Sequence, residues 1–100
     1  MTADAPFLEV LNGPLKGTQF RLVGESALIG RAPECDIRLE GVKGVSRQHA
    51  QVLIMEDRLH VKDLGSQNGT TVDGKRVSEA SVPSGSTIKI GQASLRVHGM

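Results

Sequence analysis

Three polar residues in this chain have the types and the order needed to bind a phosphorylated peptide. Arg31 follows a short apolar run, Ser46 lies in a later polar stretch, and Asn68 lies in a third. A guanidinium and a hydroxyl both suit a phosphate group, because each can donate a charge-assisted hydrogen bond to it. A carboxamide can bond a peptide backbone through both its donor and its acceptor. On three successive loops of a small β protein, this set predicts a phosphopeptide-binding site and not an enzyme.

Length and composition limit the alternatives. The 100 residues fit one domain, which we expect to span residues 7–98 after a short flexible N-terminal tail at residues 1–6. The net charge of +1 gives no basic field for nucleic acid, and the only aromatic residues are Phe7 and Phe20. A single cysteine, Cys35, suits a reducing compartment. With no apparent signal sequence or membrane-length apolar run, we expect a cytoplasmic protein that contacts neither nucleic acid nor membrane.

Short apolar or alternating runs, separated by turn residues, predict an all-β protein. The stretch 50–55 could also form a helical turn, but the turn residues Glu56 and Asp57 and an alternating strand follow it. We therefore predict a strand there, with both faces buried. Asp73–Gly74 predicts a two-residue hairpin. The fold expected is a two-sheet, largely antiparallel β-sandwich. The predicted strands are Phe7–Leu11, Thr18–Val23, Ala27–Gly30, Cys35–Leu39, Ala50–Met55, a strand holding Leu59 and Val61, the hairpin strands around Val72 and Val77, Thr87–Ile90 and Ser94–His98.

The motifs between about Leu28 and Val77 closely resemble those of the forkhead-associated (FHA) domain family. The resemblance implies a twisted sandwich whose loops, at one end, grip a phosphothreonine peptide, with no catalysis and no cofactor. It also implies that the partner is a protein phosphorylated in a Ser/Thr kinase pathway. The matching stretches are Gly30-Arg31, Cys35-Asp36-Ile37, Val45-Ser46-Arg47-Gln48-His49-Ala50, Asp63-Leu64-Gly65-Ser66-Gln67-Asn68-Gly69-Thr70 and Val72-Asp73-Gly74.

The resemblance also assigns binding roles to individual residues. Arg31 and Ser46 would bond the phosphate, and Asn68 would bond the peptide main chain beside the phosphothreonine. Arg47 could add a second cation to the phosphate, and Gln67 could touch the phosphothreonine or take no part.

Three further residues would support the binding loops by the same resemblance. Gly30 would lie where a side chain would crowd the loop, His49 would brace the loop that holds Ser46, and Gly69 would permit a turn. We expect Arg31 to be exposed and Cys35 to be a small core residue.

Other interpretations of these residues stay open. Arg31 could be a solvated arginine at the end of a strand, and Ser46 with His49 could be a nucleophile and its base, although no acidic partner accompanies them. The three histidines lack metal-ligand spacing, so no metal site is expected. Lys43 could attract acidic peptides, and Thr2 could itself be phosphorylated and captured by a second copy.

The leading hypothesis is a phosphothreonine-dependent binding module that recruits a partner phosphorylated by a Ser/Thr kinase. The alternative is a phosphate-independent scaffold or oligomerisation domain that uses the surface of the sandwich. The residues alone do not identify the partner, the kinase, the oligomeric state or the residues preferred beside the phosphothreonine.

Overall fold

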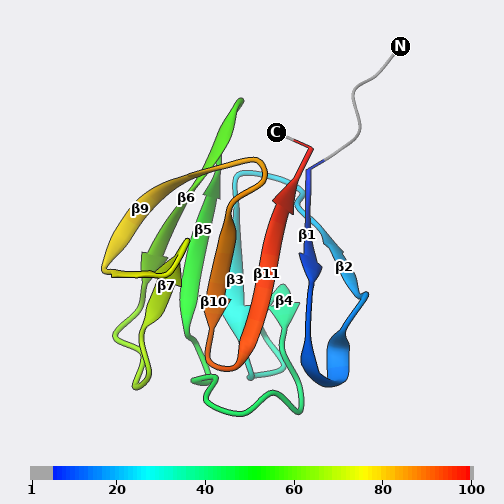
Figure 1. The fold of residues 1–100 in the computed structure, drawn as a ribbon, viewed down its shortest axis with the longest axis vertical. Coiled ribbons are helices and arrows are strands. Elements are labelled where there is room, and N and C mark those ends of the chain that lie inside the picture. Colours follow the sequence, from blue (N-terminus) through cyan, green and yellow to red (C-terminus); the bar gives the residue numbers. More distant parts are fainter. Residues whose placement is uncertain (1–5, 100) are drawn as a thin grey trace.

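In a computed structural model that describes residues 6–99, the chain folds into two stacked β-sheets (Figure 1). One sheet has the strand order β2-β1-β11-β10-β7-β8 and the other has the order β4-β3-β5-β6-β9. The prediction of a two-sheet sandwich is confirmed. The elements are β1 (Phe7–Val10), the 3-10 helix η1 (Gly13–Leu15), β2 (Gln19–Arg21), β3 (Ser26–Gly30), β4 (Ile37–Arg38), β5 (Ala50–Ile54), β6 (Arg58–Asp63), β7 (Thr70–Val72), β8 (Lys75–Val77), β9 (Glu79–Pro83), β10 (Thr87–Ile90) and β11 (Ala93–His98).

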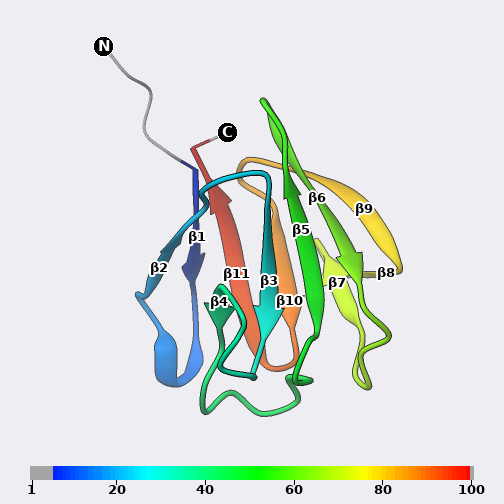
Figure 2. The same ribbon diagram turned by 180° about the vertical axis from the view of Figure 1, so that it is seen from behind.

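Nearly all strand pairs are antiparallel, as predicted. Of the pairs in the described part of the chain, only β3 with β4 is parallel, with Ile29 opposite Ile37. The connections β3–β4, β4–β5 and β6–β7 and the tight turn β10–β11 all lie at one end of the sandwich, the lower end in Figure 1 and in the reverse view of Figure 2. This end therefore collects polar loops that are far apart in the sequence.

The core between the sheets is aliphatic, as the scarcity of aromatic residues predicts. Alternate residues of the central strands point inward, because successive side chains in a strand face opposite sides. The side chains of Leu8 in β1 and Leu95 in β11 pack from one sheet, and Val52 in β5 and Val61 in β6 pack from the other; all four are 0% exposed. Phe7 lies outside this core and stacks on His98 with ring centroids 4.7 Å apart.

The hairpin predicted at Asp73–Gly74 is confirmed. Val72 pairs with Lys75 across a two-residue loop. Both loop residues have positive φ, 49° for Asp73 and 87° for Gly74, as a type I′ turn requires. The side chain of Asp73 also accepts a hydrogen bond from the backbone N–H of Thr87, which ties the turn to β10.

Two expectations about strands are wrong or incomplete. The stretch 50–55 is a strand, but only one of its faces is buried: Val52 is 0% exposed, whereas Leu53 and Met55 are 39% and 41% exposed. The outer face of this sheet is therefore open at β5, and the unbroken apolar run does not mark a doubly covered strand. Strand β9 (Glu79–Pro83) was not predicted, because Val82 is its only fully buried residue.

Residues 1–5, which include Thr2 and all of the predicted tail except Pro6, lie outside the described residues. Within residues 6–99 there is no helix long and apolar enough to span a membrane.

Candidate functional site

An open hollow of about 410 Å³ lies at the loop end of the sandwich. The five residues predicted to bind the peptide, which come from three separate connections, all line it. Arg31 follows β3, Ser46 and Arg47 lie between β4 and β5, and Gln67 and Asn68 lie between β6 and β7. The structure thus brings the predicted set together. The backbone of Gly44 and Val45 completes the lining.

Arg31 is held through its backbone and through one side-chain nitrogen. Its backbone N–H donates to the carbonyl of Ser46 (3.0 Å), and its Nε–H donates to the carbonyl of Val45 (3.2 Å). The side chain is exposed, as predicted, and the two terminal guanidinium nitrogens remain available to a ligand. The fold therefore directs this arginine along the loop that carries Ser46.

Ser46 is oriented so that its hydroxyl hydrogen stays free. The backbone N–H of Gln67 donates to Ser46 Oγ at 3.2 Å, which uses the hydroxyl as an acceptor. A serine hydroxyl also has one hydrogen to donate. The hydroxyl can therefore donate to a phosphate oxygen while it holds the β4–β5 and β6–β7 loops together.

His49 is buried (0% exposed) and connects the same two loops from the interior of the sandwich. Its Nδ1 accepts a hydrogen bond from the backbone N–H of Ser46 (3.1 Å), and its Nε2 lies 2.8 Å from the carbonyl oxygen of Gly69. These two contacts require the proton on Nε2 and a free lone pair on Nδ1. The ring thus fixes the position of Ser46 relative to the turn that follows Asn68.

Gly30 lies against the backbone of Arg47. A Cβ at Gly30 would overlap the carbonyl oxygen of Arg47 and would lie 2.9 Å from Cys35 Sγ. The same carbonyl accepts hydrogen bonds from the backbone N–H of Ala32 (3.1 Å) and from the Cys35 thiol (3.2 Å). Only glycine leaves room for the strand end carrying Arg31 to approach this loop so closely.

Cys35 is buried, as predicted, but it also has a polar role. Burial raises the pKa of the thiol, so the sulfur keeps the proton that it donates to the carbonyl of Arg47. This bond connects the β3–β4 loop to the loop with Ser46 and Arg47.

Asn68 lines the hollow, with part of its carboxamide available to a ligand. Its Nδ2 donates to the carbonyl of Gly44 (3.0 Å), so one amide hydrogen and the amide oxygen remain for a ligand. Gly69 follows with a φ of 82°, a left-handed backbone conformation that residues with a side chain rarely adopt. A Cβ at Gly69 would also meet the guanidinium of Arg76, whose Nε would lie 2.5 Å away.

Asp63 organises the β6–β7 loop and was not assigned a role from the sequence. Its carboxylate accepts hydrogen bonds from the backbone N–H groups of Gly65 and Ser66 (both 3.0 Å) and from the hydroxyl of Thr70 (2.7 Å). The hydroxyl of Ser66 is a fourth donor, and its oxygen accepts from the N–H of Gly69. An aspartate followed two and three residues later by glycine and serine is the available sequence signal, because it is typical of a side-chain-closed turn.

We expect stability to depend on the charge of Asp63. Burial opposes ionisation, but the bonds from Ser66, Thr70 and Gly65 outweigh it and lower the pKa of Asp63 below its ordinary value of 3.8. The unfolded state then binds the proton more readily than the folded state, so this contribution to stability is complete above the unfolded pKa and is lost as the pH falls through the folded pKa. Asp63→Asn should lower the free energy of unfolding by about 1–2 kcal/mol at pH 7. Urea denaturation at pH 7 and pH 3 should show the two proteins converging at the lower pH; an equal difference at both would contradict this role.

The cations around the hollow form no ion pair in the described part of the chain, although the pKa of Glu34 is lowered by hydrogen bonds and, to a lesser extent, by the charge of Arg47. The ion pairs found between residues 6 and 99 involve Arg38, Arg58, His60 and His98, and none involves Arg31, Lys43 or Arg47. Arginines that line an open hollow favour an anionic ligand. In the same described range, no three metal-ligating side chains gather at one place.

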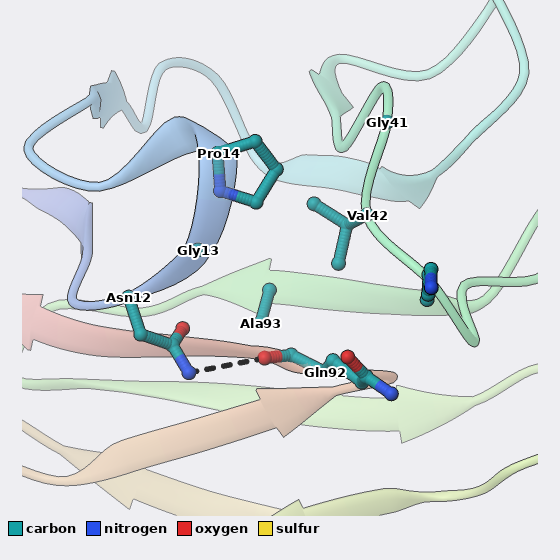
Figure 3. A pocket seen from close by; sticks show the side chains of 8 residues that line it. Asn12, Gly13, Pro14, Gly41, Val42, Gln92 and Ala93 are labelled. Atoms are coloured by element: carbon teal, nitrogen blue, oxygen red, sulfur yellow. Dashed lines mark hydrogen bonds between the residues drawn. The ribbon is translucent and has the colours of Figure 1, made fainter.

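A second hollow, which Figure 3 shows from close by, has a volume of about 270 Å³. Its floor is apolar, with Val42 and Ala93 only 7% and 2% exposed. Asn12 Nδ2 donates to the carbonyl of Gln92 at 3.1 Å along its edge. Lys43 belongs to this lining, whereas its neighbour Gly44 belongs to the first hollow, so the two hollows lie on either side of one stretch of backbone.

Comparison with known proteins identifies related sequences and folds. The family model of the FHA domain matches residues 27–91. The oxoglutarate dehydrogenase inhibitor of Corynebacterium efficiens is 38% identical over 92% of this chain and 64% of its own length. The glycogen accumulation regulator GarA of Mycolicibacterium smegmatis is 35% identical over 92% of this chain and 58% of its own length. The chain therefore spans about three-fifths of these relatives.

Solved structures of similar fold are FHA domains, and one of the two described next has a bound partner. One, from a study of phosphothreonine-dependent FHA domain interactions, has a TM-score of 0.85 and 30% identity, covering 95% of this chain and 96% of that one. The FhaA FHA domain complexed with the intracellular domain of Rv3910 has a TM-score of 0.84 and 31% identity, covering 94% of this chain and all of the other.

Proposed function

Because this chain belongs to the FHA domain family, we propose that it binds phosphothreonine peptides at the 410 Å³ hollow and thereby recruits a partner phosphorylated by a Ser/Thr kinase. The observation that carries the proposal is the convergence of Arg31, Ser46 and Asn68 on that hollow from three connections. A phosphatase acting on the partner would release it. We assign this function to residues 7–98.

The phosphate would be bound by donors that are already in place. A phosphothreonine has close to two negative charges at pH 7 and three acceptor oxygens. Arg31 offers its terminal nitrogens, Ser46 offers its hydroxyl hydrogen, and Arg47 adds a second cation. Each charge-assisted bond contributes about 1.5–3 kcal/mol net. After the cost of ordering the peptide, a micromolar complex of roughly −8 kcal/mol is expected.

Asn68 would bind the peptide backbone beside the phosphothreonine. One hydrogen of its carboxamide is already fixed on Gly44, so the plane of the group is set before the ligand arrives. The other hydrogen and the oxygen can then bond a passing peptide unit without loss of side-chain freedom. Gln67 lies beside it in the same lining and would contact the phosphothreonine.

The partner chain would continue into the second hollow. A peptide advances about 3.3–3.6 Å per extended residue, so a few residues suffice to pass from Gly44 across Lys43. The apolar floor formed by Val42 and Ala93 would take an apolar side chain, and the ammonium of Lys43 at the edge would attract acidic sequences.

The geometry does not favour hydrolysis by Ser46 and His49. The ring of His49 uses Nδ1 for the backbone N–H of Ser46 and Nε2 for the carbonyl of Gly69. Neither nitrogen faces the Ser46 hydroxyl as a general base would. We therefore propose a binding module and not an enzyme. Its free buried thiol, Cys35, suits the reducing cytoplasm as its location.

The proposal is tested with a degenerate library of phosphothreonine peptides and the identical unphosphorylated library. The protein should select phosphorylated sequences only, and a selected peptide should lose measurable binding when its phosphate is removed. Equal binding of the two forms would instead favour the phosphate-independent scaffold that uses the surface of the sandwich.

We expect binding to weaken on acidification. The second pKa of a phosphothreonine is about 6, so the ligand has lost most of its second charge at pH 5. Affinity for a selected peptide, measured by calorimetry at pH 7.5 and pH 5, should fall at the lower pH. A difluoromethylene phosphonate analogue is the control: its fluorines lower the second pKa, so it should lose less affinity at pH 5. Unchanged affinity of the phosphothreonine peptide at pH 5 would argue against recognition of the dianion.

A further inference from the structure

Arg76 lies at the edge of the candidate site without lining either hollow. It is the central residue of β8 (Lys75–Val77) and pairs with Thr71 of β7. Its side chain is exposed and reaches back to cover Gly69: a Cβ built on that glycine would lie 2.5 Å from Arg76 Nε and 2.9 Å from Cζ. The guanidinium of Arg76 therefore lies against Gly69, the residue that directly follows Asn68.

The charge of Arg76 is not compensated by the fold. Arg38 pairs with Glu40 and Arg58 pairs with Asp57, but within residues 6–99 no ion pair involves Arg76. Asp63, the carboxylate that organises this loop, is occupied by its own serine, threonine and backbone donors. A planar guanidinium laid over a glycine still presents its terminal donors to solvent.

The position of Arg76 relative to Asn68 indicates what it would meet. On one side, the side chain of Asn68 is hydrogen-bonded to Gly44, whose neighbour Lys43 lines the second hollow. On the other side, Asn68 is followed in the chain by Gly69, which the guanidinium of Arg76 covers. Consecutive Cα atoms are about 3.8 Å apart, so Arg76 is within reach of a peptide bonded to Asn68. A peptide that crosses the hollow would thus pass a cation at each end.

We propose that Arg76 binds an acidic side chain of the phosphorylated partner, on the side of the phosphothreonine that faces away from Lys43. This inference rests on the proposed function and adds a sequence preference to it. Arginine suits the task better than lysine, because its rigid fork bonds both oxygens of a carboxylate at once. The preferred ligand is then a phosphothreonine peptide with an aspartate or glutamate a few residues from the phosphate.

The test uses the full chain and a series of synthetic peptides. The base peptide has one phosphothreonine among alanines, and each member of the series places a single aspartate at one of the flanking positions. For the wild-type protein, aspartate on the side of the phosphothreonine that faces away from Lys43 should strengthen binding by about 3- to 10-fold. Arg76→Ala should abolish that gain and leave affinity for the base peptide within about 2-fold, and Arg76→Lys should keep part of the gain. Lys75→Ala, which removes the same charge from the opposite face of β8, should keep all of it.

Several outcomes would overturn this role for Arg76. If Arg76→Ala weakens the base peptide as much as the aspartate peptides, the residue holds the Asn68–Gly69 turn and does not bind the partner. If the gain persists in Arg76→Ala, or is equally lost in Lys75→Ala, the gain has another origin. If the wild type binds the base peptide only when it is phosphorylated but gains nothing from aspartate, this inference fails while the proposed function stands. If it binds no phosphopeptide, both fail.

Discussion

Replacing Arg31 with alanine is expected to weaken binding of a selected phosphothreonine peptide by about 10- to 150-fold, while the protein stays folded. The loss corresponds to about 1.5–3 kcal/mol, the contribution of charge-assisted bonds to a phosphate. Folding should be little affected, because the side chain is exposed and its side-chain hydrogen bond, to the carbonyl of Val45, is only partly buried. Calorimetric titration gives the affinity, and a thermal melt gives the stability.

The control for this prediction is Arg58→Ala. Arg58 is also exposed and is paired with Asp57 beside the β5–β6 turn, at the opposite end of the sandwich. The Arg58→Ala substitution removes the same charge and should leave peptide binding unchanged apart from a small, salt-dependent effect. If Arg31→Ala unfolds the protein, the arginine is structural; if both variants bind as the parent does, Arg31 does not contact the phosphate.

Replacing His49 with alanine is expected to cost about 3–5 kcal/mol of folding free energy and to impair binding as well. The ring is fully buried, so its removal leaves a cavity. It also leaves the N–H of Ser46 and the carbonyl of Gly69 without their partner. A domain of this size has a total stability of about 5–15 kcal/mol, so this one substitution removes a large part of it.

Urea denaturation and peptide titration together test the role of His49. The matched control is His60→Ala, whose ring is partly exposed and bonds a single carboxylate, that of Glu79. This control should cost about 1 kcal/mol or less. A His49→Ala protein as stable as the parent would exclude the bracing role; a destabilised variant with unchanged affinity would show that the ring supports the fold without positioning Ser46.

The sheets could be predicted where the sequence contains its own local signals. The hairpin at Asp73–Gly74 and strand β10 (Thr87–Ile90) have strong turn residues and period-two alternation, and both were located correctly. Strand β9 has one apolar anchor, Val82, and is held as an edge strand by pairing with β6, which is a tertiary effect. Whether the second face of β5 is buried likewise depends on whether another element covers that face. A run of apolar residues in the sequence does not determine this.

The residues that line the candidate site could be predicted, but most of the bonds between their loops could not. The types, order and spacing of Arg31, Ser46 and Asn68 predict that they lie together, and all three line the hollow. The sequence does not show that the hydroxyl of Ser46 accepts from the N–H of Gln67, or that Cys35 donates to the carbonyl of Arg47. Such bonds join positions that are distant in the chain, so they become visible only with the fold.

Preorganisation connects these bonds to the proposed function. The loops at the binding end are joined by His49, Ser46, Asn68 and Cys35, so the donors are in place before a ligand arrives. Little loop ordering is then left to oppose binding, and more of the interaction energy appears as affinity. An open hollow lined by two arginines, Arg31 and Arg47, can in this way bind a flexible phosphorylated segment.

The most direct test of the central claim is an NMR titration of the amide-labelled protein with a selected phosphothreonine peptide. We predict that the large shift changes fall on the backbone amides of residues 30–35, 44–49 and 65–69, and that the unphosphorylated peptide causes none of them. Shift changes confined to the outer faces of the sheets, or equal changes with the unphosphorylated peptide, would contradict it.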